Sequence, residues 1–194
     1  MKKLWTWIVR LHGWKYDVPE KGTRPEIYHS VMIMAPHTAI ADFFLGAGCI
    51  WKLGLNPRIF MKKEFFNCFT RGILTRLGVV AVDRGNTHNN LVPRAVECFA
   101  KNEKVTFVIT PEGTRKKVLR WKRGFYEIAA EAKVPIVLTY IDFKTKTMGV
   151  GPTFYPTGDF HADLPKIMAY YHNIGPKHPE GWNVPKSLDE LERQ

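Results

Sequence analysis

The sequence lacks several features that would assign it to common classes. No run reaches about 18 apolar residues, the length that a helix needs to cross a bilayer, so we predict no transmembrane helix. The three cysteines contain no CxxC pair, which argues against a disulfide framework and a zinc site. Ser30 and Ser187 are the only serines, and neither lies in a GxSxG segment, which argues against a serine nucleophile. Phosphate-binding GxxxxGK[ST] and GxGxxG loops are also missing.

What the sequence has in excess is positive charge. The formal net charge is +11 over 194 residues, with a sequence pI near 9.6. Such an excess indicates an anionic partner, which is a nucleic acid, an anionic lipid surface, or a phosphorylated substrate or carrier. Composition alone leaves these three open.

Residues 1–15 are expected to form a separate amphipathic helix. Apolar residues recur at the i, i+3, i+4 spacing of one helical face, and three of the six tryptophans lie in this segment. Tryptophan favours the membrane–water interface, although the same stripe also suits a helix packed on the domain. Both interpretations stay open, and the nearby lysines favour lipid. The predicted membrane-interface residues are Leu4, Trp5, Trp7, Ile8, Leu11 and Trp14.

The following segment alternates between strand and helix patterns, which predicts a single α/β domain over residues 26–175 with a largely parallel sheet flanked by helices. Residues 176–194 are expected to form a C-terminal tail. The predicted strands are 31–35, 58–61, 79–82, 105–110 and 136–141, with an edge strand at 149–155. The predicted helices are 43–53, 64–77, 89–101, 124–132 and 164–173.

Two constellations could carry chemistry. His37 and Asp42 span a strand-to-helix turn, where the carboxylate can return to the imidazole and orient it as a base for a hydroxyl. Thr110-Pro-Glu-Gly-Thr-Arg115 follows another strand, and Arg84 follows a third. Because the carboxyl ends of parallel strands share one sheet edge, these groups are expected to converge there. A base and two arginines would hold a hydroxyl close to an anion.

These segments resemble the four blocks of the glycerolipid acyltransferase family, in family order over roughly residues 30–141. His37 to Asp42 is similar to its HxxxxD motif, and Phe107 to Arg115 to its EGTR block. The segment from Met61 to Phe66, continuing to Arg84, looks like the second block, and residues 134–138 like the fourth.

The resemblance implies direct acyl transfer without an acyl-enzyme. His37 would deprotonate the acceptor hydroxyl, with Asp42 as its partner, and Pro135 would shape the acyl site. No bound cofactor or metal is implied, because acyl-coenzyme A or acyl carrier protein is the co-substrate. The residues implied in acceptor binding are Lys62, Arg84, Glu112, Gly113, Thr114 and Arg115.

Pro36, Ala39 and Lys116 depart from the family pattern, which leaves the acceptor open between a lysophospholipid or glycerophosphate and a phosphate-free lysolipid. The run from Arg115 to Arg123 holds six basic residues in nine and is expected to meet anionic head groups or an acidic carrier protein. We therefore expect a peripheral location on the cytoplasmic face of a membrane. A non-catalytic module that binds lipid or nucleic acid is the alternative, but it leaves the four blocks unexplained.

Overall fold

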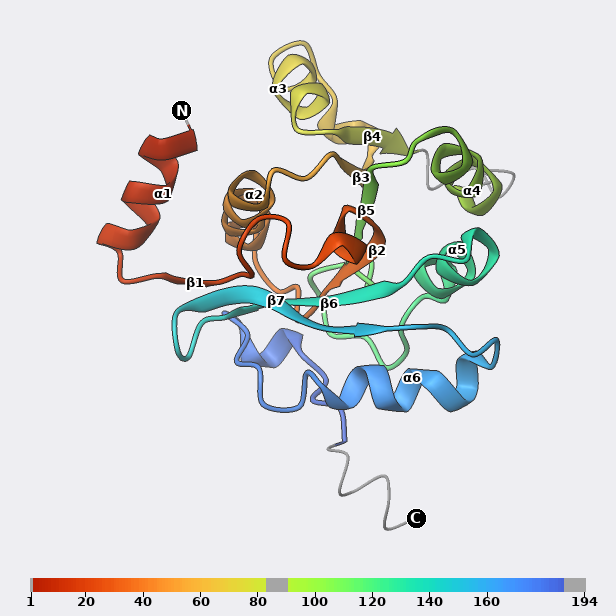
Figure 1. Ribbon diagram of the computed structural model, residues 1–194. Helices are drawn as coiled ribbons and strands as arrows, with labels where there is room; N and C mark the ends of the chain where they lie inside the picture. The colour runs from red at the N-terminus through yellow and green to blue at the C-terminus, as the bar shows by residue number, and fades with distance from the viewer. Residues whose placement is uncertain (1, 83–90, 187–194) are drawn as a thin grey trace.

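The computed structural model describes residues 2–82 and 91–186, and it confirms a single α/β domain (Figure 1). Seven strands form one sheet in the order β1-β7-β6-β2-β5-β3-β4. Neighbouring strands are parallel throughout, except for the antiparallel pair β6 and β7. The strands are β1 (Lys15–Asp17), β2 (His29–Met34), β3 (Pro57–Lys62), β4 (Val79–Val82), β5 (Val105–Ile109), β6 (Ile136–Asp142) and β7 (Thr147–Phe154).

Helices cover both faces of this sheet. Along the strand order, the connections from β2 to β3 and from β3 to β4 move towards the β4 side of the sheet. The connections from β4 to β5 and from β5 to β6 move in the opposite direction. Because parallel crossovers are right-handed, α2 and α3 cover one face while α4 and α5 cover the other (Figure 1). The helices are α1 (Lys2–Leu11), α2 (Ala41–Leu53), α3 (Arg71–Arg76), α4 (Leu91–Lys101), α5 (Gly124–Ala132) and α6 (Phe160–Ala169). Short 3-10 turns are η1 (Pro25–Tyr28), η2 (Lys63–Phe65) and η3 (Pro179–Gly181).

The core is built around the central strand β2, which is buried from Ser30 to Met34. Val31 and Ile33 are fully buried and pack in the main cluster with Phe125 of α5. A smaller cluster joins Val9 of α1 to Met148 of β7. No helix among the described residues is long and apolar enough to span a membrane.

Four expectations about elements need correction. The predicted edge strand, now β7, is interior, because the three-residue strand β1 pairs with it on the outer side. The predicted helix over 64–77 is interrupted, because the Asn67 side chain accepts the backbone N–H groups of Phe69 and Thr70 and forms a turn.

The predicted helix over 164–173 begins earlier, at Phe160, because Asp159 caps it by accepting from the N–H groups of His161 and Ala162. Finally, α1 ends at Leu11, so Trp14 lies outside the helix.

Candidate active site

The loop after β2 brings His37 and Asp42 together. The chain leaves β2 at Met34, passes through a cis Ala35–Pro36 bond, and enters α2 at Ala41. Asp42 therefore lies on the first helical turn, and its Oδ2 is 3.0 Å from His37 Nδ1. The Asp42 side chain is 1% exposed and that of His37 is 18% exposed, so the carboxylate is inside and the imidazole reaches the surface.

Asp42 is held in place by more than the imidazole. Its Oδ2 also accepts the backbone N–H groups of Thr38 and Ala39, each at 2.9 Å. A carboxylate only accepts hydrogen bonds, so His37 Nδ1 carries its hydrogen towards Asp42 and the lone pair lies on Nε2. This arrangement presents Nε2 as the atom that can take a proton from a substrate.

Glu112 supports the same loop from the neighbouring strand. Parallel pairing places Ile33 of β2 beside Ile109 of β5, so the loops that follow both strands leave the same sheet edge. Glu112 Oε1 accepts the backbone N–H of His37 at 2.8 Å, and the residue is 2% exposed. Burial raises the pKa of the Glu112 carboxyl to about 8, opposed by the His37 hydrogen bond and reinforced by the Asp42 charge.

The turn after Glu112 depends on glycine. Gly113 has φ of +67°, and a Cβ there would lie 2.9 Å from Lys122 Cε, so the lysine side chain crosses directly over the turn. The backbone N–H of Lys122 donates to the Pro111 carbonyl at 2.8 Å, which ties the two segments together. Beyond the turn, the Thr114 hydroxyl accepts from the Lys116 N–H, and Arg115 is exposed.

Residues near the C-terminus also reach this site, and no motif in the sequence indicates their contribution. The backbone N–H of His178 donates to the Thr38 hydroxyl at 3.2 Å. A Cβ on Gly181 would lie 3.1 Å from the Arg115 carbonyl oxygen, so η3 contacts both active-site loops. Trp182 anchors this segment in the core, 4% exposed and with its ring centroid 6.4 Å from that of Trp121.

The other predicted site residues are distributed differently. Lys62 ends β3, beside Val82 and at the same edge as His37, whereas its side chain and all of Arg84 lie outside the described residues. Pro135 precedes β6, and its carbonyl accepts from the N–H of Val31 near the start of β2. Val31 is three residues before the end of β2, which is about 10 Å along the strand from Met34, and the His37 loop begins only after Met34. The structure therefore does not bring Pro135 to the dyad, and its contribution to an acyl site stays a prediction.

The predicted interface helix shows features of both interpretations. Val9 is buried at 4% and Trp5 packs against the same cluster, so α1 is attached to the domain. Trp7 and Leu11, one turn apart, are 59% and 63% exposed. Ile8 is half-buried, Trp14 packs edge-on against Phe143, and the side chain of Leu4 lies outside the described residues.

The family model described as Acyltransferase matches residues 15–142, well over half of the chain. A search of curated protein sequences found no significant match. The crystal structure of the 1-acyl-sn-glycerophosphate (LPA) acyltransferase PlsC from Thermotoga maritima is similar in fold, with a TM-score of 0.64 and 17% identity over 100% of this chain and 78% of that one. The matched region contains both loops that meet at His37, and the chain therefore belongs to the Acyltransferase family of enzymes.

Proposed function

We propose that the protein is an O-acyltransferase that moves a fatty acyl group from an acyl thioester to the hydroxyl of a lysophospholipid or glycerophosphate. The observation that carries this proposal is the buried Asp42 carboxylate 3.0 Å from His37 Nδ1, which leaves Nε2 as a base at the protein surface. The family match supports acyl transfer as the reaction class.

In the proposed reaction, His37 Nε2 takes the proton of the acceptor hydroxyl as the oxygen attacks the thioester carbonyl. The C–S bond then breaks, and the thiolate of coenzyme A or acyl carrier protein leaves and takes up the proton held by the imidazolium. Asp42 stabilises that imidazolium through Nδ1–H while the charge exists. General-base assistance of this kind contributes about 100- to 10,000-fold to the rate.

The basic residues suit an acceptor that carries phosphate. Arg115 is exposed beside the Gly113 turn, and Lys122 crosses that turn. A guanidinium offers a planar set of donors for phosphate oxygens, and an ammonium adds a compact charge. Lys62 lies at the same sheet edge. We therefore assign acceptor head-group binding to this basic group, with Thr114 and Arg84 as further candidates from the sequence.

A small apolar pocket, with a cavity volume of about 40 Å³, is the candidate for one end of an acyl-chain site. It lies between α2 and the sheet and includes Met34, the last residue of β2 and three positions before His37. Other lining residues are Met32, Cys49, Ile50, Leu53, Leu55 and Val108.

We also assign the enzyme a peripheral position on an anionic membrane, with α1 at the interface. Val9 fastens α1 to the domain while Trp7 and Leu11 face solvent, which is the orientation that an interfacial helix needs. A lysophospholipid acceptor and its product are lipids of that same surface.

A transfer assay tests the substrate assignment. Acyl-coenzyme A and acyl carrier protein donors are crossed with lysophosphatidate, glycerol 3-phosphate and a phosphate-free lysolipid. We expect transfer to the phosphorylated acceptors, and Arg115→Ala should raise their KM while leaving the KM of any phosphate-free acceptor unchanged. Equal losses with both acceptor types would contradict phosphate binding by Arg115. Lys117→Ala, in the same basic run, is the matched control.

A further inference from the structure

A second set of exposed apolar side chains lies far from α1 in sequence and has no part in the chemistry above. Phe65 at the end of η2 is 52% exposed, Phe69 is 86% exposed, and Ile73 of α3 is 66% exposed. Phe69 and Ile73 are four residues apart, and the next residue, Leu74, is buried and attaches the helix to the domain. The segment thus has one face inward and an apolar face outward.

The outward position of Phe69 is fixed by its own turn. Asn67 Oδ1 accepts the N–H groups of Phe69 and Thr70, at 3.0 and 2.9 Å. In return, the Thr70 hydroxyl accepts the N–H of Asn67 at 3.1 Å, and the N–H of Arg71 donates to the Asn67 carbonyl at 3.0 Å. Because these bonds close the turn on itself, the exposure of Phe69 is a built feature of the fold.

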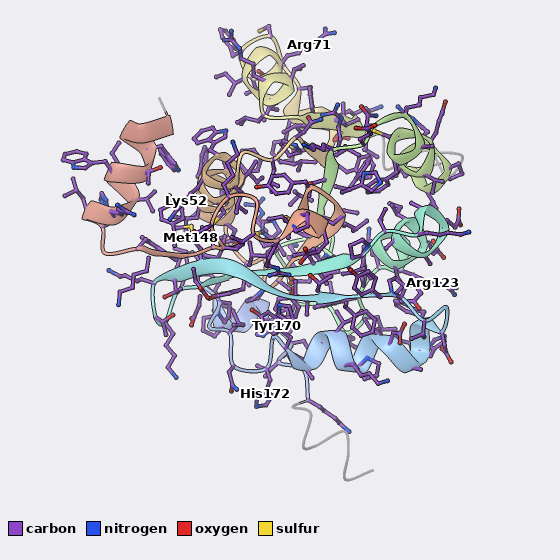
Figure 2. The ribbon with its side chains drawn as sticks, in the orientation of Figure 1. Lys52, Arg71, Arg123, Met148, Tyr170 and His172 are labelled. Carbon is purple, nitrogen blue, oxygen red and sulfur yellow. The ribbon has the colours of Figure 1, made fainter. Side chains whose placement is uncertain are left out.

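The segment that carries these apolar side chains is rich in positive charge. Residues 58–76 contain five basic residues and one acidic residue, Glu64. The basic residues are Arg58, Lys62, Lys63, Arg71 and Arg76. Figure 2 shows Arg71 at the outer end of the molecule. Apolar side chains that project from a basic surface match the two layers of an anionic bilayer, with acidic head groups outside and acyl chains beneath.

The position of the segment agrees with a lipid surface. The right-handed crossovers place α3 on the same sheet face as α2, against which α1 packs (Figure 1). Trp7 and Leu11 of α1 and Phe44 of α2 are also exposed there. Ile40, three residues after His37, is 62% exposed at the start of α2. Contacts at both α1 and α3 would therefore hold this face of the domain against the bilayer.

We propose that residues 63–76 form a second membrane-contact surface, which inserts Phe65, Phe69 and Ile73 into the interface of an anionic bilayer. The proposal rests on the peripheral membrane position assigned above and adds a contact that is independent of α1. Binding at two separated points fixes the tilt of the domain on the bilayer, which a single amphipathic helix does not.

The test is partition onto extruded vesicles of phosphatidylcholine and phosphatidylglycerol, measured by co-sedimentation of the full chain. The double variant Phe69→Glu/Ile73→Glu should lower the partition coefficient by at least about tenfold, because two large apolar side chains no longer leave water. Tyr155→Glu is the matched control, since Tyr155 is 66% exposed but follows β7, which is four strands away from β3 in the sheet. Its partition should equal that of the wild type.

Three results would overturn the proposal. The first is a double variant that binds vesicles as the wild type does. The second is normal vesicle binding combined with lost binding to an acidic acyl carrier protein, which would make the surface a protein-docking site. The third is a lipid-free dimer that the double variant converts to monomers in sedimentation velocity.

Transfer to a water-soluble short-chain acceptor, below its critical micelle concentration, separates this proposal from the proposed function. The double variant should keep the wild-type kcat there, because the dyad is untouched. If the wild type itself shows no transfer, the proposed function fails while the partition measurement still decides the membrane contact.

Discussion

Replacing Glu112 by glutamine gives a prediction whose size follows from the structure. Glu112 is 2% exposed, its Oε1 accepts the N–H of His37, and its Oε2 has no hydrogen-bond partner among the described residues. A glutamine side chain has nearly the shape of the protonated acid and keeps an oxygen for the His37 N–H. The variant therefore removes the ionisation of residue 112 and preserves the contact.

The expected effect on stability depends on pH. Burial raises the pKa of Glu112 from 4.5 to about 8 in the folded protein, so folding favours the protonated form. The stabilising contribution of protonated Glu112 to the free energy of unfolding is fully present below pH 4.5, where the unfolded chain is also protonated. It is lost as pH rises towards 8, where the carboxyl of the folded protein also ionises. A difference of about 3.5 pKa units corresponds to at most about 5 kcal/mol at 1.36 kcal/mol per unit.

The assay is urea unfolding of wild type and Glu112→Gln at pH 5, 6, 7 and 8, followed by tryptophan fluorescence. The free energy of unfolding of the wild type should fall relative to that of the variant by a few kcal/mol across this range. Two curves that remain parallel from pH 5 to 8 would refute a raised pKa at Glu112. Glu131→Gln, on the exposed end of α5, controls for a general effect of charge removal.

Two further variants test contacts around the site, and a third tests the exposed face of α1. Thr38→Val removes the acceptor of the His178 N–H and should cost about 1 kcal/mol of unfolding free energy and lower kcat, whereas Thr38→Ser should retain both. Gly113→Ala should lower the free energy of unfolding by about 1 kcal/mol and reduce turnover, because residue 113 has a φ of +67° and an added Cβ would meet Lys122. Gly72→Ala is the control and should not reduce turnover, because an added Cβ there has no atom within 4 Å. Trp7→Glu/Leu11→Glu should lower the partition onto anionic vesicles with unchanged unfolding free energy, since both side chains are exposed, and the second contact should retain part of the binding. A partition coefficient equal to that of the wild type would make α1 purely structural.

Local patterns in the sequence predicted the features that depend on short spacing. The strands from β2 to β6 follow from short hydrophobic runs. The pairing of His37 with Asp42 follows from their five-residue spacing across a strand-to-helix turn. The convergence of two loops at one sheet edge follows from parallel topology, and the β2–β5 pairing confirms it. The spacing of apolar residues also predicts that α1 is amphipathic. It does not predict which side packs on the domain, at Val9, and which side is exposed, at Trp7.

Features that join distant segments were not predictable in this way. The bond from the His37 N–H to Glu112 spans 75 residues, and that from His178 to Thr38 spans 140. Each requires knowledge of which strands are neighbours and where the C-terminal segment returns. The three-residue strand β1 is too short to show alternation, and the turn at Asn67 depends on one side chain that competes with a helix.

The central claim is that His37 is the general base, and the turnover of His37→Ala tests it most directly. Transfer from acyl-coenzyme A or acyl carrier protein to lysophosphatidate should fall by about 100-fold or more, with an unfolding free energy close to that of the wild type. His161→Ala, an exposed histidine on α6, should transfer at the wild-type rate. A folded His37→Ala enzyme that keeps wild-type turnover would contradict the account.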